Sequence, residues 1–281
     1  MDDHSIVVTI INGAVTLINT ALGRVFPTRF PRKSVEGSDE RHEAVESLGH
    51  FGKFVFSWME LSPDAREKLA RSEFIRAGRA GDALMDLVGS AHENDSMLAI
   101  CGYKGDYSKV YYKKNFQKCR EVRRVFSYDA IVKEIETKEP ECFALDGLKM
   151  HLNKNETGDC DVEVFVIPKG KFIKDLGGGN FNPPFSFGLA ILRDGKNCLK
   201  KAAVHWEIDA KTTKDLIAIE GVIVDSEQDE VLTELAKLHK SIADSNAVLS
   251  SKNNPEQIAA ICTELEEFWQ THNAAKGRTI G

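Results

Sequence analysis

The spacing of apolar residues changes from a helical period to strict alternation over residues 162–224 and then returns to a helical period. Alternation of apolar and other residues is typical of a half-buried strand. A further short strand is expected at 97–103. The alternating or apolar stretches lie at 162–166, 185–191, 203–208 and 217–224. Turn residues separate them, and Asp194-Gly195 is a hairpin signal, so we expect at least four strands in an antiparallel meander.

Residues on both sides of this block repeat apolar positions every three or four residues, as amphipathic helices do. The expected helices before residue 162 are 41–60, 63–76, 79–89 and 128–138. After Asp225 we expect two more helices, the first capped by Ser226 with Asp229 and the second beginning at Asn254-Pro255. The sequence therefore predicts an α+β fold: N-terminal helices, a central mainly antiparallel sheet of four or more strands, and a C-terminal αα-hairpin.

The length of 281 residues fits one or two packed domains. Apolar residues make up 42% and charged residues 28% of the chain, values that exclude a disordered tail, a collagen-like repeat and a polytopic membrane protein. The expected regions are a helical N-terminal region at 1–96, a mixed region with the sheet at 97–225, and an acidic helical hairpin with a tail at 226–281.

Residues 5–23 contain no charged residue. Their polar residues recur every three or four positions, so a helix here carries one narrow, uncharged polar stripe. Three interpretations fit this segment: a buried central helix, a helix that inserts into a membrane or lines a pore, and a homo-oligomer interface. In the membrane interpretation the inserting residues are Ile6, Thr9, Ile10, Asn12, Thr16, Asn19 and Leu22.

Basic residues cluster at 24–33 and again at 104–124, where eight Lys or Arg face two acidic residues. Four aromatic residues are interleaved with the second cluster: Tyr107, Tyr111, Tyr112 and Phe116. This mixture suits an anionic membrane surface or unpaired nucleic acid, and a solvated charged face is the third interpretation. The expected anionic-surface residues are Arg24, Arg29, Arg32, Lys33, Lys109, Lys113, Lys114, Lys118, Arg120, Arg123 and Arg124.

The C-terminal block has the opposite charge. Residues 226–272 carry nine acidic residues and three lysines, in a chain whose net charge is −6. An acidic helical hairpin could cover the basic stretch in a resting state, and an ordinary solvated helix pair is the alternative. The acidic total therefore excludes a uniformly basic coat protein, but it leaves room for a local anion-binding surface.

Motifs of common enzymes are missing from the sequence. It contains no GxSxG, HExxH, Walker A or GxGxxG motif, and we predict no catalytic residue, cofactor or metal site. The six cysteines include no CxxC pair, and the start Met1-Asp2-Asp3 lacks the positive residues of a secretory signal. Cys119 lies among basic residues that could lower its pKa. We therefore expect free thiols and a cytoplasmic location, with recruitment to a membrane.

The uncharged segment, the basic aromatic stretch and the acidic hairpin together look like the arrangement in autoinhibited membrane-active proteins, including cytosolic pore formers. The likeness is one of charge and architecture only. It implies a non-enzymatic, self-assembling protein that acts on anionic lipid surfaces as a homo-oligomer, of the pore-forming or cell-death type. The alternatives are a nucleic-acid-binding or viral-type assembly protein and an enzyme with an unrecognised motif.

Overall fold

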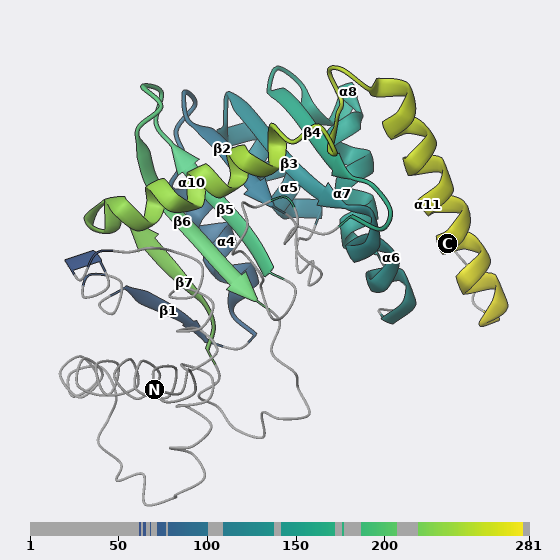
Figure 1. Ribbon diagram of the computed structural model, residues 1–281, viewed down its shortest axis with the longest axis horizontal. Helices are drawn as coiled ribbons and strands as arrows, with labels where there is room; N and C mark the ends of the chain where they lie inside the picture. The colour runs from purple at the N-terminus through teal and green to yellow at the C-terminus, as the bar shows by residue number, and fades with distance from the viewer. Residues whose placement is uncertain are drawn as a thin grey trace, which may run out of the picture.

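The computed structural model describes residues 62, 64–65, 68, 72–76, 78–100, 109–137, 142–171, 176, 187–206 and 219–277. These residues form a mixed eight-stranded sheet with helices on both faces (Figure 1). The strands are β1 (Glu73–Arg76), β2 (Ser96–Ile100), β3 (Glu121–Ser127), β4 (Asp161–Ile167), β5 (Phe187–Arg193), β6 (Leu199–Trp206), β7 (Ile219–Asp225) and β8 (Leu249–Ser250). Their order across the sheet is β1-β7-β6-β5-β2-β3-β4-β8.

The described helices connect or cover these strands. They are α4 (Ala80–Gly89), α5 (Lys109–Lys118), α6 (Tyr128–Thr137), α7 (Phe143–Leu152), α8 (Lys154–Thr157), the 3₁₀ turn η2 (Ser226–Gln228), α10 (Asp229–Ala243) and α11 (Pro255–Ala275). The expected helices at 79–89 and 128–138 are confirmed as α4 and α6. The expected capping box lies one residue earlier than predicted, because Asp225 and Gln228 cap each other's backbone N–H groups.

The sheet is mixed, so the expectation of a mainly antiparallel sheet is corrected. Strands β2, β3 and β4 pair in parallel, joined by α5 and then by α6, α7 and α8. Parallel neighbours need such crossovers, since a short turn cannot return the chain to the same end of the sheet. The antiparallel meander is confirmed for β5, β6 and β7. The other strand expected in it, β4, lies instead between β3 and β8.

Two apolar cores lie on opposite faces of the sheet. Helices α4, α5, α6 and α7 cover one face, where Leu87, Met97 and Phe126 belong to the larger core. Helix α10 covers the other face, where Leu98, Ile191 and Leu235 pack together. Alternate residues of a strand point to opposite faces, which explains why neighbours such as Met97 and Leu98 belong to different cores.

The two C-terminal helices form as expected, but they do not make a hairpin. Helix α10 contacts β2, β6 and β7, whereas α11 contacts α6 and α7, with β8 between the two helices in the chain. Figure 1 shows α10 across the front of the sheet and α11 at its right-hand end. The sequence pattern gives the apolar stripe of each helix, but it does not say which surface that stripe meets.

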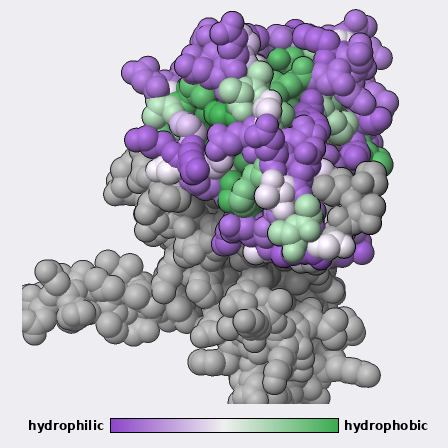
Figure 2. Space-filling view, turned by 90° about the vertical axis from the view of Figure 1, so that its right-hand side faces the viewer, coloured by the Kyte–Doolittle hydropathy of each residue, from purple (hydrophilic) through white to green (hydrophobic). Residues whose placement is uncertain are grey.

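Helix α11 packs lightly on its neighbours. Over 21 residues only Ile258, Leu265 and Asn273 are buried, while Phe268 and Trp269 are half-buried. Figure 2 shows this side of the molecule, where hydrophilic residues surround smaller hydrophobic areas. The acidic residues of α11 meet this side of the fold, since Glu266 lies 2.8 Å from Lys149 and Glu264 accepts a hydrogen bond from Tyr128 at 2.7 Å.

Strands from all three expected regions join the one sheet. Strand β1, from the first region, pairs with β7, and β8, from the last region, pairs with β4. The expected helix at 63–76 is wrong at its end, because 73–76 is strand β1. The expected helix at 41–60 and the uncharged segment 5–23 lie outside the described residues.

Candidate functional site

The predicted membrane-inserting residues Ile6, Thr9, Ile10, Asn12, Thr16, Asn19 and Leu22 lie outside the described residues, as do Arg24, Arg29, Arg32 and Lys33. No helix in the part of the chain that the structure describes combines the length and the apolarity that crossing a bilayer requires. The site is therefore built from the described part of the other basic cluster and from the residues that the fold brings to it.

The basic stretch does not form one surface. On α5, Lys109 Nζ lies 3.2 Å from a carboxylate oxygen of Asp146, and Lys113 Nζ lies 3.3 Å from one of Glu156. These lysines connect α5 to α7 and α8 rather than standing free. The remaining basic side chains of α5 and its following loop are half-buried or exposed: Lys114, Lys118 and Arg120.

Three of the four aromatic residues of the same stretch lie in the core, and the fourth, Tyr107, lies outside the described residues. Tyr111 and Tyr112 are 2% and 0% exposed, and Phe116 is also buried, so these rings cannot stack on bases. Arg124 is fully buried, with its guanidinium carbon 5.3 Å and 5.0 Å from the ring centroids of Tyr111 and Tyr112. The prediction that Arg124 contacts an anionic surface is therefore wrong, because this position of β3 faces the helix-covered core.

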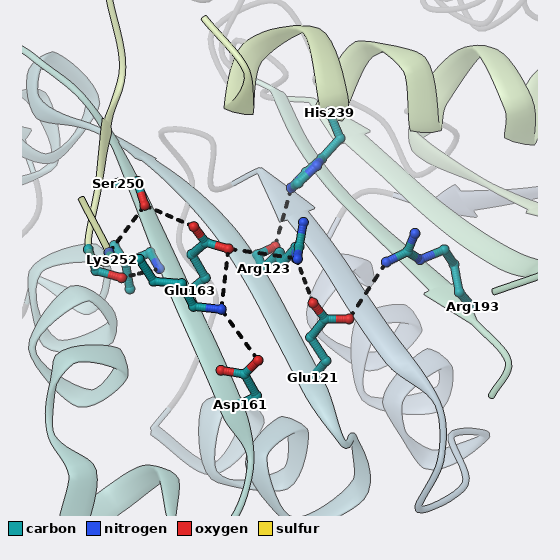
Figure 3. Close-up of polar contacts among 10 residues, drawn as sticks. Glu121, Arg123, Asp161, Glu163, Arg193, His239, Ser250 and Lys252 are labelled. Atoms are coloured by element: carbon teal, nitrogen blue, oxygen red, sulfur yellow. Dashed lines mark hydrogen bonds and ion pairs between the residues drawn. The ribbon is translucent and has the colours of Figure 1, made fainter. Parts of the chain in front are cut away.

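Arg123 points to the other face of the sheet and enters a network of charged groups (Figure 3). Its Nε donates to Glu121 Oε1 at 2.6 Å, and it lies 3.8 Å from Glu163 Oε2 on the neighbouring strand. Arg123 and Glu163 are register partners across β3 and β4. Opposite charges at such positions stabilise a strand pair.

The network continues to the edge of the sheet. Ser250 Oγ, on β8, donates to Glu163 Oε1 at 2.8 Å. Lys252 Nζ lies 3.4 Å from Asp161 and 3.7 Å from Glu163. Each charged group in this part of the network has a partner. These contacts hold β8 against β4 and leave few groups free to bind a ligand.

The other end of the network is Arg193, which the β5–β6 hairpin places beside Glu121 (Figure 3). The hairpin turn forms as predicted: Asp194 Oδ1 accepts from the backbone N–H groups of Lys196 and Cys198, both at 2.8 Å. Asn197 takes a left-handed conformation with φ 65°. The β5–β6 register shifts between Leu192 and Arg193, an irregularity of the kind that redirects a side chain.

Helix α10 lies over this end of the network and forms with the sheet a half-open cavity of about 480 Å³. Its cationic lining comes from Arg123, Arg193, Lys237 and Lys240. The rest of the lining is Leu98, Asn197, Leu199, Thr233, Ala236, His239, Ala243 and Asp244. Four basic residues and one acidic residue line the cavity, so its lining carries a net positive charge.

Among the cations of the cavity, Arg193 is the one that is half-buried without a close carboxylate partner. Its side chain is 22% exposed, and its Nη2 approaches Glu121 only to 3.9 Å. Its Nε is buried and has no hydrogen-bond acceptor among the described residues. Burial lowers the pKa of this guanidinium, and the nearby Glu121 partly offsets that effect. Because Nε is inaccessible, an anion in the cavity would meet the Nη groups of Arg193, which can donate two hydrogen bonds to one anionic group.

His239 closes the cavity from the α10 side. It is 2% exposed, and its Nε2 lies 3.3 Å from the carbonyl oxygen of Arg123. A carbonyl can only accept, so Nε2 carries the proton. Burial, together with the nearby arginines, lowers the pKa of His239 to about 4, so the ring is neutral at physiological pH. It therefore contributes no charge to the cavity.

Cysteine and metal chemistry find no support in the described residues. Burial raises the pKa of Cys119 to about 12, which is opposite to the lowering expected from its basic neighbours. The described cysteines are free thiols, as expected. Within the same ranges, no group of three or more His, Cys, Asp or Glu side chains is arranged to hold a metal ion.

Of the predicted anionic-surface residues that the structure describes, only Arg123 lines the cavity. Arg193, Lys237, His239 and Lys240 were not predicted as site residues. Arg193 had one usable signal, because it directly precedes the Asp194-Gly195 turn, so its place at a strand end could be read from the sequence. Comparison of the chain with protein-family models, with curated proteins and with solved structures finds no match.

Proposed function

We propose that this protein binds a small anionic ligand in the cavity between α10 and the sheet. The observation that carries the proposal is Arg193, a half-buried guanidinium in the cavity lining whose closest carboxylate contact among the described residues is 3.9 Å. The volume of about 480 Å³ lies within the usual range of small-molecule sites. Eight of the twelve lining residues are polar or charged, so the lining is more polar than that of most small-molecule sites, as suits an anionic ligand.

The contact with Arg193 would supply part of the binding free energy. A hydrogen bond to a charged group contributes about 1.5–3 kcal/mol, which corresponds to roughly ten- to hundredfold in affinity. The contact counts more in a partly buried site than on an open surface, because water screens it less. Arg123 and Lys237 add to the positive potential, although their own carboxylate partners, Glu121 and Glu234, lie close at 2.6 Å and 2.7 Å.

Calorimetric titration of the full chain with three anions tests the proposal: phenyl phosphate, phenyl sulfate and benzoate. We expect at least one of them to bind, and Arg193→Ala to weaken that binding by about tenfold or more. Arg120→Ala is the matched control, since Arg120 is exposed and does not line the cavity. Absence of binding by all three anions at millimolar concentration, or unchanged affinity in Arg193→Ala, would contradict the proposal.

A second candidate function is association with an anionic membrane, in which residues 5–23 insert and copies of the chain assemble. The observation that favours it is Val110 on α5, a large apolar side chain that is 62% exposed beside Lys109 and Lys113. An exposed apolar residue among lysines suits the boundary of an anionic bilayer.

Flotation with vesicles that contain phosphatidylserine tests this second function. We expect the double variant Val110→Asp/Lys118→Glu to float less than the unchanged chain, because it loses apolar contact and positive charge. The double variant Lys196→Glu/Asn197→Asp, in the exposed β5–β6 turn, changes the net charge by the same −3 and is the matched control. Equal flotation of the α5 variant and this control would argue against a membrane contact at α5.

A further inference from the structure

We infer that the ligand of the α10 cavity is a phosphate monoester, bound as the dianion, with its phosphate at Arg193 and an apolar body against Leu98 and Leu199. This inference rests on the proposed function and goes further, because it names the chemical class. Three observations lead to it: two cations of the lining lack a close carboxylate, the guanidinium of Arg193 ends in the cavity lining, and apolar residues line the same cavity.

The first observation is the charge balance of the lining. Arg123 and Lys237 each have a carboxylate oxygen within 3 Å, on Glu121 and Glu234. Arg193 has only the 3.9 Å contact with Glu121. Lys240 has no carboxylate within 4 Å among the described residues, and its side chain is exposed at the rim. Two cations thus remain without a close counter-charge, and a ligand with two negative charges complements them.

The second observation is the end of the Arg193 side chain. Its Nε is inaccessible, so a ligand in the cavity meets the two Nη groups, of which Nη2 has only a long contact with Glu121. Two N–H donors at the end of a guanidinium can bind two oxygens of one group, as a phosphate offers them. Lys240 lines the same cavity and adds a second positive charge.

The third observation is the apolar part of the lining. Leu98 on β2 is 5% exposed, and Leu199 at the start of β6 is half-buried. Ala236 and Ala243 face them from α10. A cavity of about 480 Å³ is larger than phosphate alone requires, so these residues are placed to contact a carbon body. Asp244, at the end of the same helix, repels an anion and so keeps the phosphate toward Arg193.

Two sources supply this chemistry: a soluble phosphate monoester, or the headgroup of a lipid that ends in a phosphate monoester. The group recognised is the same, and only the carbon body differs. The source is therefore left to the experiment, whose arms separate the two.

The main arm compares phenyl phosphate with phenyl sulfate by calorimetry of the full chain at pH 7.5 and pH 5. The second pKa of a phosphate monoester is near 6, so most phenyl phosphate is a monoanion at pH 5. We expect its dissociation constant to rise roughly tenfold between pH 7.5 and pH 5, following the loss of the dianion. Phenyl sulfate is a monoanion at both pH values, so its binding is expected to be weaker at pH 7.5 and unchanged by pH.

The protein also has charged and titratable groups around the cavity, which the comparison of the two ligands must separate from the titration of phenyl phosphate. They are Glu121 and Arg123 on β3, Arg193 on β5, and Lys237, His239, Lys240 and Asp244 on α10. His239 stays neutral between pH 7.5 and 5, since burial lowers its pKa to about 4. Any titration of the protein would affect both ligands, and phenyl sulfate therefore reports it separately.

Variants separate the roles of the two cations. Lys240→Gln is expected to reduce the preference for phosphate over sulfate while both ligands still bind, and Arg193→Lys is expected to weaken both. If phenyl sulfate binds as tightly as phenyl phosphate at pH 7.5, or if phenyl phosphate binding does not change with pH, the dianion inference is wrong and the proposed function stands. If neither ligand nor benzoate binds, the proposed function itself fails.

The second arm uses vesicles that contain either phosphatidic acid, a phosphate monoester, or phosphatidylserine, at equal mole fraction. Flotation with phosphatidic acid alone, lost in Arg193→Ala, assigns the ligand to a lipid. Binding of phenyl phosphate without flotation on either vesicle assigns it to a soluble ester. Equal, Arg193-dependent flotation on both vesicles would overturn recognition of a monoester.

Discussion

The imidazole Nε2 of His239 donates to the backbone carbonyl oxygen of Arg123 across 3.3 Å. This contact joins α10 to β3 in the lining of the cavity, and His239 is 2% exposed. It uses a neutral histidine, because a charged ring would lie beside three arginines that each disfavour the proton. The contact therefore makes the attachment of α10 sensitive to acid.

We predict that the protein loses stability as the pH falls below about 6.5. The native pKa of His239 is about 4, so between pH 6.5 and pH 4 the unfolded chain binds a proton that the native protein does not. Stability contributed by the neutral ring is present above pH 6.5 and declines by about 1.4 kcal/mol per pH unit, in total roughly 3 kcal/mol. Urea unfolding at pH 7.5, 5.5 and 4.5 measures this decline.

His239→Gln is expected to flatten this pH dependence, since glutamine keeps a donor and does not titrate. His92→Gln, at an exposed position, is the control and is expected to behave like the unchanged chain. Part of the slope should persist in His239→Gln, because burial also lowers the pKa of His151 well below its usual value. An identical slope in all three proteins would show that His239 is not the group responsible.

A second prediction concerns Gly147, in the middle of α7. A Cβ atom at this position would overlap the ring of Tyr112, which is fully buried. Gly147→Ala is therefore expected to destabilise the protein by about 1–3 kcal/mol, although alanine is the better helix former. Gly89→Ala in α4 is the matched control, because the nearest atom there is the flexible end of Lys114 at 3.5 Å. Thermal unfolding should separate the two variants, and equal melting temperatures would refute the packing argument.

A third prediction concerns Glu220, a buried residue of β7. Its Oε1 accepts from the backbone N–H groups of Arg79 and Ala80, at 2.8 Å and 2.7 Å, and so caps the start of α4. Glu220→Ala removes the one oxygen that accepts both hydrogen bonds and is expected to cost about 2–3 kcal/mol of unfolding free energy. Glu227→Ala, at an exposed position, is expected to change it by less than about 0.5 kcal/mol. Urea unfolding measures both, and similar losses would contradict a capping role.

A fourth prediction concerns Glu121, the carboxylate that Arg123 and Arg193 share. Glu121→Gln removes a negative charge 3.9 Å from Arg193, so we expect anion affinity to increase by a few-fold. Glu163→Gln is the control, because Glu163 contacts Arg123 and Lys252 but not Arg193 in the described network. Calorimetry with phenyl phosphate gives the comparison. Weaker binding in Glu121→Gln would mean that Glu121 orients Arg193 for the ligand instead of competing with it.

The sequence predicted local structure better than pairing. The β5–β6 hairpin followed from Asp194-Gly195, and α11 followed from Asn254-Pro255, because turn and cap residues act locally. Strand β3 was missed, because Glu121, Arg123 and Arg124 made 104–124 look like a charged surface. Its neighbours β2 and β4 are reached through helical crossovers, and a single sequence does not show which distant strands pair.

The candidate site was missed for the same reason. Arg123 was predicted as an anion-binding residue, but Arg193 and Lys240 come from segments 70 and more residues away. The fold alone brings β3, β5 and α10 around one cavity. The burial of Arg124 beside Tyr111 was equally hidden, since adjacent arginines in a strand look alike in the sequence yet face opposite sides.

The two outermost strands have a consequence for contact between copies of the chain. Strand β1 has four residues and β8 has two, so each end of the sheet offers few free backbone groups. Beside β8, Ser251 covers β4 further, by donating from its backbone N–H to Val164 and accepting at Oγ from Val164. Short, covered edges oppose the addition of a strand from another molecule. Self-assembly of this chain, if it occurs, would therefore have to use helices or other surfaces rather than extend the sheet.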